Sequence, residues 1–137
     1  MNNDCIFCKI ITGVIPAQKI YEDDKVFAFL DINPVNPGHT LVIPKEHFKN
    51  IMETPPEILC NLVKVVQKIA PAIVKATDSE GFNVGINTGS SAGQVIFHTH
   101  IHVMPRRSDD GRALWKGKEY GEGEIEETAE KIKTAIG

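Results

Sequence analysis

Long hydrophobic runs are missing from this chain of 137 residues, and none approaches the roughly 18 apolar residues of a membrane-spanning helix. The N-terminal segment has neither the basic nor the apolar region of a secretory signal. Neither sign of charge predominates, because 15 Lys and Arg are balanced by 18 Asp and Glu. This near-balance argues against a general polyanion-binding surface. The three cysteines are few and odd in number, as is typical of a reducing compartment. We therefore expect a cytoplasmic domain with no membrane or nucleic-acid partner.

The five histidines, in contrast, are concentrated in two short stretches of the sequence. They are His39, His47, His98, His100 and His102. Histidines scattered for packing or solubility would not group in this way, so the two stretches are candidates for a shared site.

The pattern of apolar and turn residues predicts an α+β domain with a mainly antiparallel five-stranded sheet. A long helix should run from Thr54, a possible N-cap, to Ala76, with a kink near Pro71. Its apolar arc is too wide for one sheet face, which predicts a twofold homodimer. The expected strands are 18–21, 26–30, 39–43, 81–86 and 94–103, and a final amphipathic helix is expected over 125–136.

Residues 97–103 alternate strictly between histidine and mostly apolar side chains. Because alternate side chains of a strand lie on the same face, His98, His100 and His102 should lie together. An exposed strand with an ordinary polar face would not require histidine, which is scarce. Neutral and protonated imidazoles coexist near neutral pH, and such a set suits attack on phosphorus and proton transfer to a leaving group.

The small residues just upstream, 89–93, could approach an anion with their backbone N–H groups. The segment lacks the Gly-Lys-Ser/Thr of a Walker A loop, and a plain hairpin turn is the simpler reading of these residues alone. Next to three histidines, a phosphate cradle becomes a plausible alternative.

The run from Gly93 to Val103 resembles the signature of the histidine triad (HIT) family, His-φ-His-φ-His-φ-φ with φ apolar, and Thr99 departs mildly from it. The segments 15–17, 22–24, 31–32 and 37–45 are also similar to this family, and most similar to its Hint-like, nucleotide-binding branch. The resemblance covers about 5–107, so we expect one domain over 1–137, with that core and a C-terminal extension over 108–137.

The resemblance implies a homodimeric HIT-like fold that hydrolyses nucleoside phosphoramidates, or related nucleotidyl conjugates, and releases a nucleoside monophosphate such as AMP. It implies that His100 is the nucleophile and that His102 and His39 complete the catalytic set. It further implies that purine nucleotides are bound by Asp31 at the ribose, Ile32 near the base, and Asn87, Gly93 and Gln94 around the phosphate. Val95 replaces the small polar residue of some Hint proteins.

Cys5-x-x-Cys8 is weak evidence by itself, because a redox motif would follow a strand and a zinc site needs further ligands. His47 and His98 could supply these, and related HIT proteins with this cysteine pair use that arrangement. The resemblance therefore implies a structural zinc ion and no organic cofactor, against the alternative of two free thiols.

Two other functions fit the same sequence. The chain could be a nucleotide-binding interaction or regulatory protein with incidental catalysis, or a dinucleoside polyphosphate hydrolase. A DNA deadenylase would call for a basic face or an added zinc finger, and neither is present.

Overall fold

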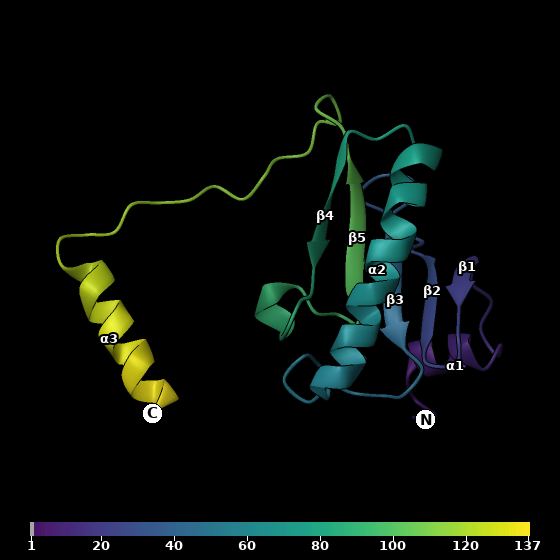
Figure 1. Cartoon of the computed structure of the whole chain (residues 1–137), viewed down its shortest axis with the longest axis horizontal. Coiled ribbons are helices and arrows are strands. Elements are labelled where there is room, and N and C mark those ends of the chain that lie inside the picture. Colours follow the sequence, from purple (N-terminus) through teal and green to yellow (C-terminus); the bar gives the residue numbers. More distant parts are fainter. Residues whose placement is uncertain (1) are drawn as a thin grey trace.

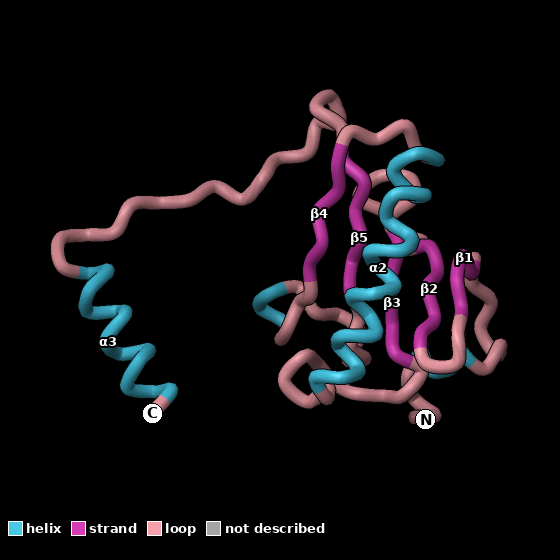
Figure 2. Tube along the Cα trace, viewed as in Figure 1, coloured by secondary structure: helices cyan, strands magenta, loops and turns pink. Residues whose placement is uncertain are grey.

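In the computed structural model, which describes residues 2–137, a five-stranded antiparallel sheet forms the centre of the body (Figures 1 and 2). The strands lie in the order β1-β2-β3-β5-β4, so β4 is an edge strand. Their bounds are β1 Lys19–Glu22, β2 Val26–Leu30, β3 Thr40–Pro44, β4 Gly81–Gly85 and β5 Ile101–Arg106. The α+β fold and the strand number predicted from the sequence are confirmed.

One face of the sheet is covered by the long helix α2, Pro56–Ala76. Its buried residues recur every three or four positions, as a helix that packs one face on a sheet requires. They meet apolar side chains of β2, β3 and β5, including Ile101 and Val103. Burial of this cluster, at roughly 25 cal/mol per Å² of apolar surface, is the main force that holds helix to sheet.

The opposite face carries a smaller aromatic cluster and the functional histidines. Phe7, from the short helix α1, Ile6–Ile11, packs there with Phe27, Phe29, Leu41 and Ile43. His102 pairs with Leu41 across β3 and β5, so its side chain lies on this same face.

Three details differ from the sequence predictions. The last strand, β5, begins at Ile101 rather than at residue 94. Residues 94–100, which follow the short 3₁₀ helix η1, Ser90–Ala92, hydrogen-bond outside the sheet, because the Gln94 amide donates to the Lys49 carbonyl and the Thr99 N–H donates to the Phe48 carbonyl. Thr54 does not cap α2, because its hydroxyl hydrogen-bonds to Thr99 (2.7 Å) and to the Asn50 carbonyl (2.8 Å). Helix α1 was not predicted. Pro71 lies inside α2 as expected, and the kink near it stays a prediction.

Beyond Arg106 the chain leaves the body as a long arm that ends in helix α3, Glu124–Ile136. Figure 1 shows α3 standing apart from the sheet, on the side of β4. None of the helices in residues 2–137 combines the length and apolarity needed to cross a bilayer.

Candidate functional site

The triad segment divides its three histidines between two neighbouring clusters. His98 lies with the two N-terminal cysteines and His47. His102 contacts His39, which directly precedes β3, and packs edge-on against His100. The three histidines therefore do not share one environment. His98 lies among potential metal ligands, whereas His100 and His102 lie in the second cluster, with His39.

The first cluster brings together Cys5, Cys8, His47 and His98, whose ligand atoms all lie within 4.8 Å of one another. Three Sγ···Nδ1 distances are 3.4, 3.5 and 3.6 Å, and the two Nδ1 atoms are 3.2 Å apart. Zn–S bonds of about 2.3 Å and Zn–N bonds of about 2.0–2.1 Å give tetrahedral edges of about 3.5 and 3.4 Å. The donor set and its spacing fit one tetrahedral ion.

The ring of His98 is oriented as a metal ligand rather than as a reacting group. Its Nε2 lies 2.8 Å from the Pro44 carbonyl oxygen, which can only accept, so Nε2 carries the proton and Nδ1 keeps its lone pair. A carbonyl partner of this kind is the usual second contact of a metal-bound imidazole. Burial, the main cause, lowers the pKa of His98 to about 4 and keeps the ring neutral.

A chain of hydrogen bonds fixes the tautomers in the second cluster. The Val35 N–H donates to His39 Nδ1 (3.0 Å), so the proton of the neutral His39 ring must be on Nε2. That proton points to His102 Nδ1, 2.9 Å away. His102 therefore carries its own proton on Nε2, which is buried and has no hydrogen-bond partner among the described residues.

His100 has the complementary arrangement. Its Nδ1 lies 2.6 Å from the His98 carbonyl oxygen, so Nδ1 is protonated and Nε2 presents a lone pair. Burial lowers the pKa of His100 and of His39, and lowers that of His102 to about 4. The cluster thus offers a neutral nucleophilic nitrogen beside a buried N–H donor that nothing in the described chain satisfies.

Asp31, at the end of β2, supplies the only carboxylate that the structure places against these rings within the described residues. Its Oδ2 lies 3.6 Å from His39 Nε2, and its Oδ1 accepts the Asn33 N–H at 2.8 Å, which holds the side chain in a turn. Ile32 beside it is almost fully exposed. This places an acceptor and an apolar side chain next to one another at the edge of the histidine cluster.

The predicted phosphate loop is an ordered turn with its own internal bonds. The N–H groups of Gly93 and Gln94 donate to the carbonyls of Ser90 and Gly89, and the Asn87 amide donates to the Gly93 carbonyl at 3.4 Å. The Gln94 side chain is buried and braces the loop against Lys49. Those two N–H groups, expected to face a phosphate, are thus occupied within the turn.

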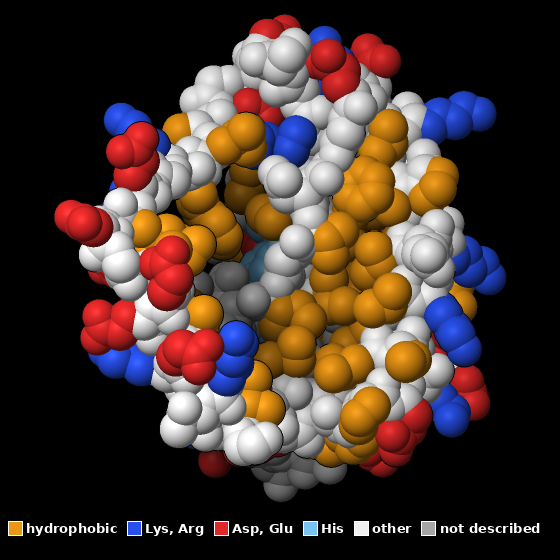
Figure 3. Space-filling model, turned by 60° about the vertical axis from the view of Figure 1, so that its left-hand side comes forward, with side chains coloured by type: hydrophobic (Ala, Val, Ile, Leu, Met, Phe, Trp, Pro, Cys, Tyr) orange, Lys and Arg blue, Asp and Glu red, His pale blue; other side chains and the backbone are white. Residues whose placement is uncertain are grey.

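Two residues of this region were missed at the level of the sequence. Phe7 packs edge-on against His100, with ring centroids 5.1 Å apart, and also contacts His98. The sequence position of Phe7, directly before Cys8, could have indicated this contact, because a metal site that joins the cysteines to His98 would bring Phe7 close to the triad. Val35 acts through its backbone, which no residue pattern reveals. Figure 3 shows a histidine at the bottom of a hollow rimmed by hydrophobic side chains.

A fold of this kind, with a triad segment on the face opposite α2, defines a class of protein, and comparison with known families identifies it. The HIT domain matches residues 12–109, so the chain belongs to the HIT family. The family expectation from the motif is thereby confirmed.

Among named relatives, the adenylylsulfatase HINT3 of Arabidopsis thaliana is 51% identical over 115 residues, which cover 84% of this chain. The match spans 57% of that relative's length.

Three solved structures extend the comparison. SMU.412c from Streptococcus mutans matches with a TM-score of 0.93 and 42% identity, over all of this chain and 88% of its own. A histidine triad nucleotide-binding protein from Sulfolobus tokodaii matches at 0.74 and 39%, over 96% and 91% of the two chains. A zinc-bound histidine triad family protein from Mycobacterium smegmatis matches at 0.76 and 38%, over 96% of each. All three share the family and the fold of this chain.

Proposed function

We propose that this protein hydrolyses nucleoside phosphoramidates, or related nucleotidyl conjugates, at the α-phosphate and releases a nucleoside monophosphate. The observation that carries the proposal is the pairing of two fixed tautomers: His100 offers a lone pair on Nε2 and His102 offers a proton on Nε2. A nucleophile beside a proton donor is what displacement of a basic leaving group needs.

In the first step, His100 Nε2 attacks the α-phosphorus and forms a P–N bond. The bond between phosphorus and the leaving nitrogen breaks, and the leaving amine takes the Nε2 proton of His102. For this step His102 is an imidazolium, charged by a proton taken up with the anionic substrate, and it becomes a neutral ring when it donates. In the second step, water attacks the nucleotidyl-imidazole, gives its proton to His102, and restores His100 as the monophosphate departs. The relative named as an adenylylsulfatase supports chemistry at the same bond position, with a different leaving group.

The remaining site residues bind the nucleotide in this proposal. Asp31 accepts hydrogen bonds from the ribose diol and Ile32 packs on the base, which we take to be a purine. His39 positions His102 through the bond between their rings. Asn87, Gly93 and Gln94 line the phosphate side as an ordered turn, and phosphate contact there would use groups other than the two occupied N–H donors.

Zinc belongs to the proposal as a structural ion held by Cys5, Cys8, His47 and His98. The spacing of the four ligand atoms and the zinc-bound relative support this assignment. With four protein ligands the ion keeps no open position, so its contribution is to tie α1 and the 44–47 turn to the start of the triad segment. We also propose that residues 1–137 act as a single HIT domain and that two copies form a homodimer.

The test is single-turnover kinetics with an adenosine phosphoramidate. His100→Ala should lower turnover at least about 10³-fold, because the covalent route is lost, and should still bind AMP. Phe97→Ala, an exposed neighbour outside the assigned set, is the control and should stay within about threefold of the parent. A His100→Ala variant that kept more than a tenth of the activity would overturn the assignment.

A further inference from the structure

The C-terminal arm exposes more apolar surface than any solvated extension needs. Trp115 is 100% exposed and Leu114 beside it is largely exposed. In α3, Ile125, Ile132 and Ile136 lie on one face with Ala129, at positions i, i+7, i+11 and i+4, and no residue of the helix is buried. A single helix of 13 residues is marginal in water, so an apolar stripe on it indicates a surface to pack against.

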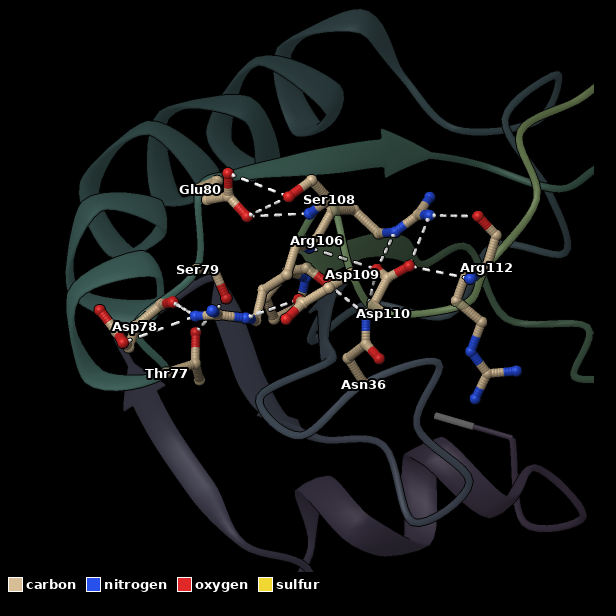
Figure 4. Close-up of polar contacts among 12 residues, drawn as sticks. Asn36, Thr77, Asp78, Ser79, Glu80, Arg106, Ser108, Asp109, Asp110 and Arg112 are labelled. Atoms are coloured by element: carbon tan, nitrogen blue, oxygen red, sulfur yellow. Dashed lines mark hydrogen bonds and ion pairs between the residues drawn. The ribbon is translucent and has the colours of Figure 1, made fainter.

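The root of the arm is held against the body by the carboxylates of Glu80, which accepts from the Ser108 N–H and hydroxyl, and of Asp110 (Figure 4). Asp110 accepts two bonds from the Arg106 guanidinium (2.7 and 3.2 Å), one from the Arg112 N–H (2.9 Å) and one from the Asn36 amide (2.9 Å). The Arg106 guanidinium, as the main cause, holds the pKa of Asp110 far below its usual range. The direction in which the arm leaves the body is therefore set by the fold.

The same arm position recurs in a solved relative. The body through Arg107 is 107 of the 137 residues, or about 0.78 of the chain. A TM-score averages per-residue values that never exceed one, so a superposition that failed over the arm would stay below that fraction. The Streptococcus mutans structure reaches 0.93 over the whole chain. An arm that floated free in each protein would not superpose, so something outside its own body holds it.

The arm leaves the body on the side of β4, where the sheet ends. Figure 1 shows it extending away from the body on the side of the edge strand β4. On that strand Phe82 is 43% exposed and Val84 is 50% exposed, and both share the sheet face covered by α2, where Val63 is also exposed. The 13 residues from 111 to 123 can span about 43 Å at roughly 3.3 Å each, more than the width of a body with a radius of gyration of about 13 Å.

We propose that the arm, residues 108–137, is exchanged between two copies of the chain. Each copy lays Leu114, Trp115 and the apolar stripe of α3 on the body of the other, across the β4 side. The proposal rests on the homodimer of the proposed function. It goes beyond it, because it assigns the arm a docking surface on the other copy and makes the stability of the dimer depend on α3.

The experiment uses isotopically light and heavy full-length chains, co-purified as mixed dimers and cross-linked through lysines. Arm lysines such as Lys131 should join body lysines near β4, such as Lys49 beside the 89–94 turn that follows this strand, between a light and a heavy chain. Arm-to-body links found only within one chain, or not found at all, overturn exchange.

A matched pair of variants gives a second readout by light scattering and by the fluorescence of Trp115, the only tryptophan. Ile132→Asp places a charge in the apolar stripe and should raise the dimer dissociation constant at least about tenfold and expose Trp115. Thr134→Asp places the same charge on the opposite face and should change it less than about twofold.

Each alternative outcome is distinct. A stable dimer with an exposed Trp115, or equal effects of the two variants, refutes exchange and leaves the homodimer. A chain that is monomeric throughout refutes both. A monomer with a shielded Trp115 means that the arm folds on its own body, which also overturns the proposal.

Discussion

Removal of the buried donor on His102 should slow the reaction by an amount that depends on the leaving group. The His39–His102 bond of 2.9 Å puts the His102 proton on Nε2, where it has no partner in the described chain. An amine leaves as a neutral molecule only if it is protonated, whereas sulfate leaves as a weakly basic anion. His102→Asn should therefore impair the two reactions unequally.

The magnitude follows from the loss of one oriented donor in a buried site. Loss of such a donor costs about 2.7–4 kcal/mol in the transition state, or about 10²–10³-fold in kcat. We expect that loss with an adenosine phosphoramidate and less than about tenfold with adenylyl sulfate, where charge stabilisation remains but proton donation is not needed.

The assay measures AMP release from both substrates with the same preparations of parent and His102→Asn protein. Because the two rates come from one sample, the ratio of the two losses is independent of any fraction that is misfolded. Equal losses with both substrates would refute proton donation by His102 and would leave it a purely structural or electrostatic role.

Three further outcomes are expected. Asp31→Ala should weaken binding of AMP by about tenfold or more but of 2′,3′-dideoxy-AMP by less than about threefold, measured by calorimetry, because only the ribose diol uses the carboxylate; equal losses would contradict the ribose role. Cys8→Ser should lower bound zinc and reduce Tm by several degrees, whereas Cys60→Ser, an exposed cysteine off the cluster, should change neither. As pH falls from about 6.5 to 4, the unfolded chain protonates His102 and the folded chain does not, so the free energy of unfolding should fall by about 2 kcal/mol through this ring, which is partly exposed; His102→Gln should flatten that slope in urea titrations.

The sequence was most informative where a period or a motif reports directly on geometry. A period of 3.6 predicted the buried face of α2, and a period of 2 predicted that Ile101 and Val103 face the core. In the structure these residues pack together in one cluster. The grouping of the metal-ligand residues followed from the resemblance and not from spacing, since Cys8 and His98 are 90 positions apart.

What could not be predicted depends on tertiary contacts. The start of the last body strand moved to Ile101 because Gln94 is used to brace a turn, and the side chain of a glutamine has no pattern that reveals this. The role of Thr54 changed because Thr99, far along the chain, provides a better partner than the helix terminus. Backbone donors such as Val35 N–H carry no sequence signal.

The two histidine clusters are joined through a single residue. His98 turns Nδ1 toward the metal-ligand atoms and Nε2 toward the Pro44 carbonyl, while its own carbonyl oxygen accepts a hydrogen bond from His100 Nδ1–H at 2.6 Å. Any ion that fixes the His98 ring also fixes the peptide that selects the tautomer of His100, and Phe7, carried on the cysteine helix, packs on both rings. The cysteine pair is therefore connected to the reacting nitrogen through His98, although it lies outside the triad. An ion held by these four residues would therefore fix the donor–acceptor pattern of the nucleophile.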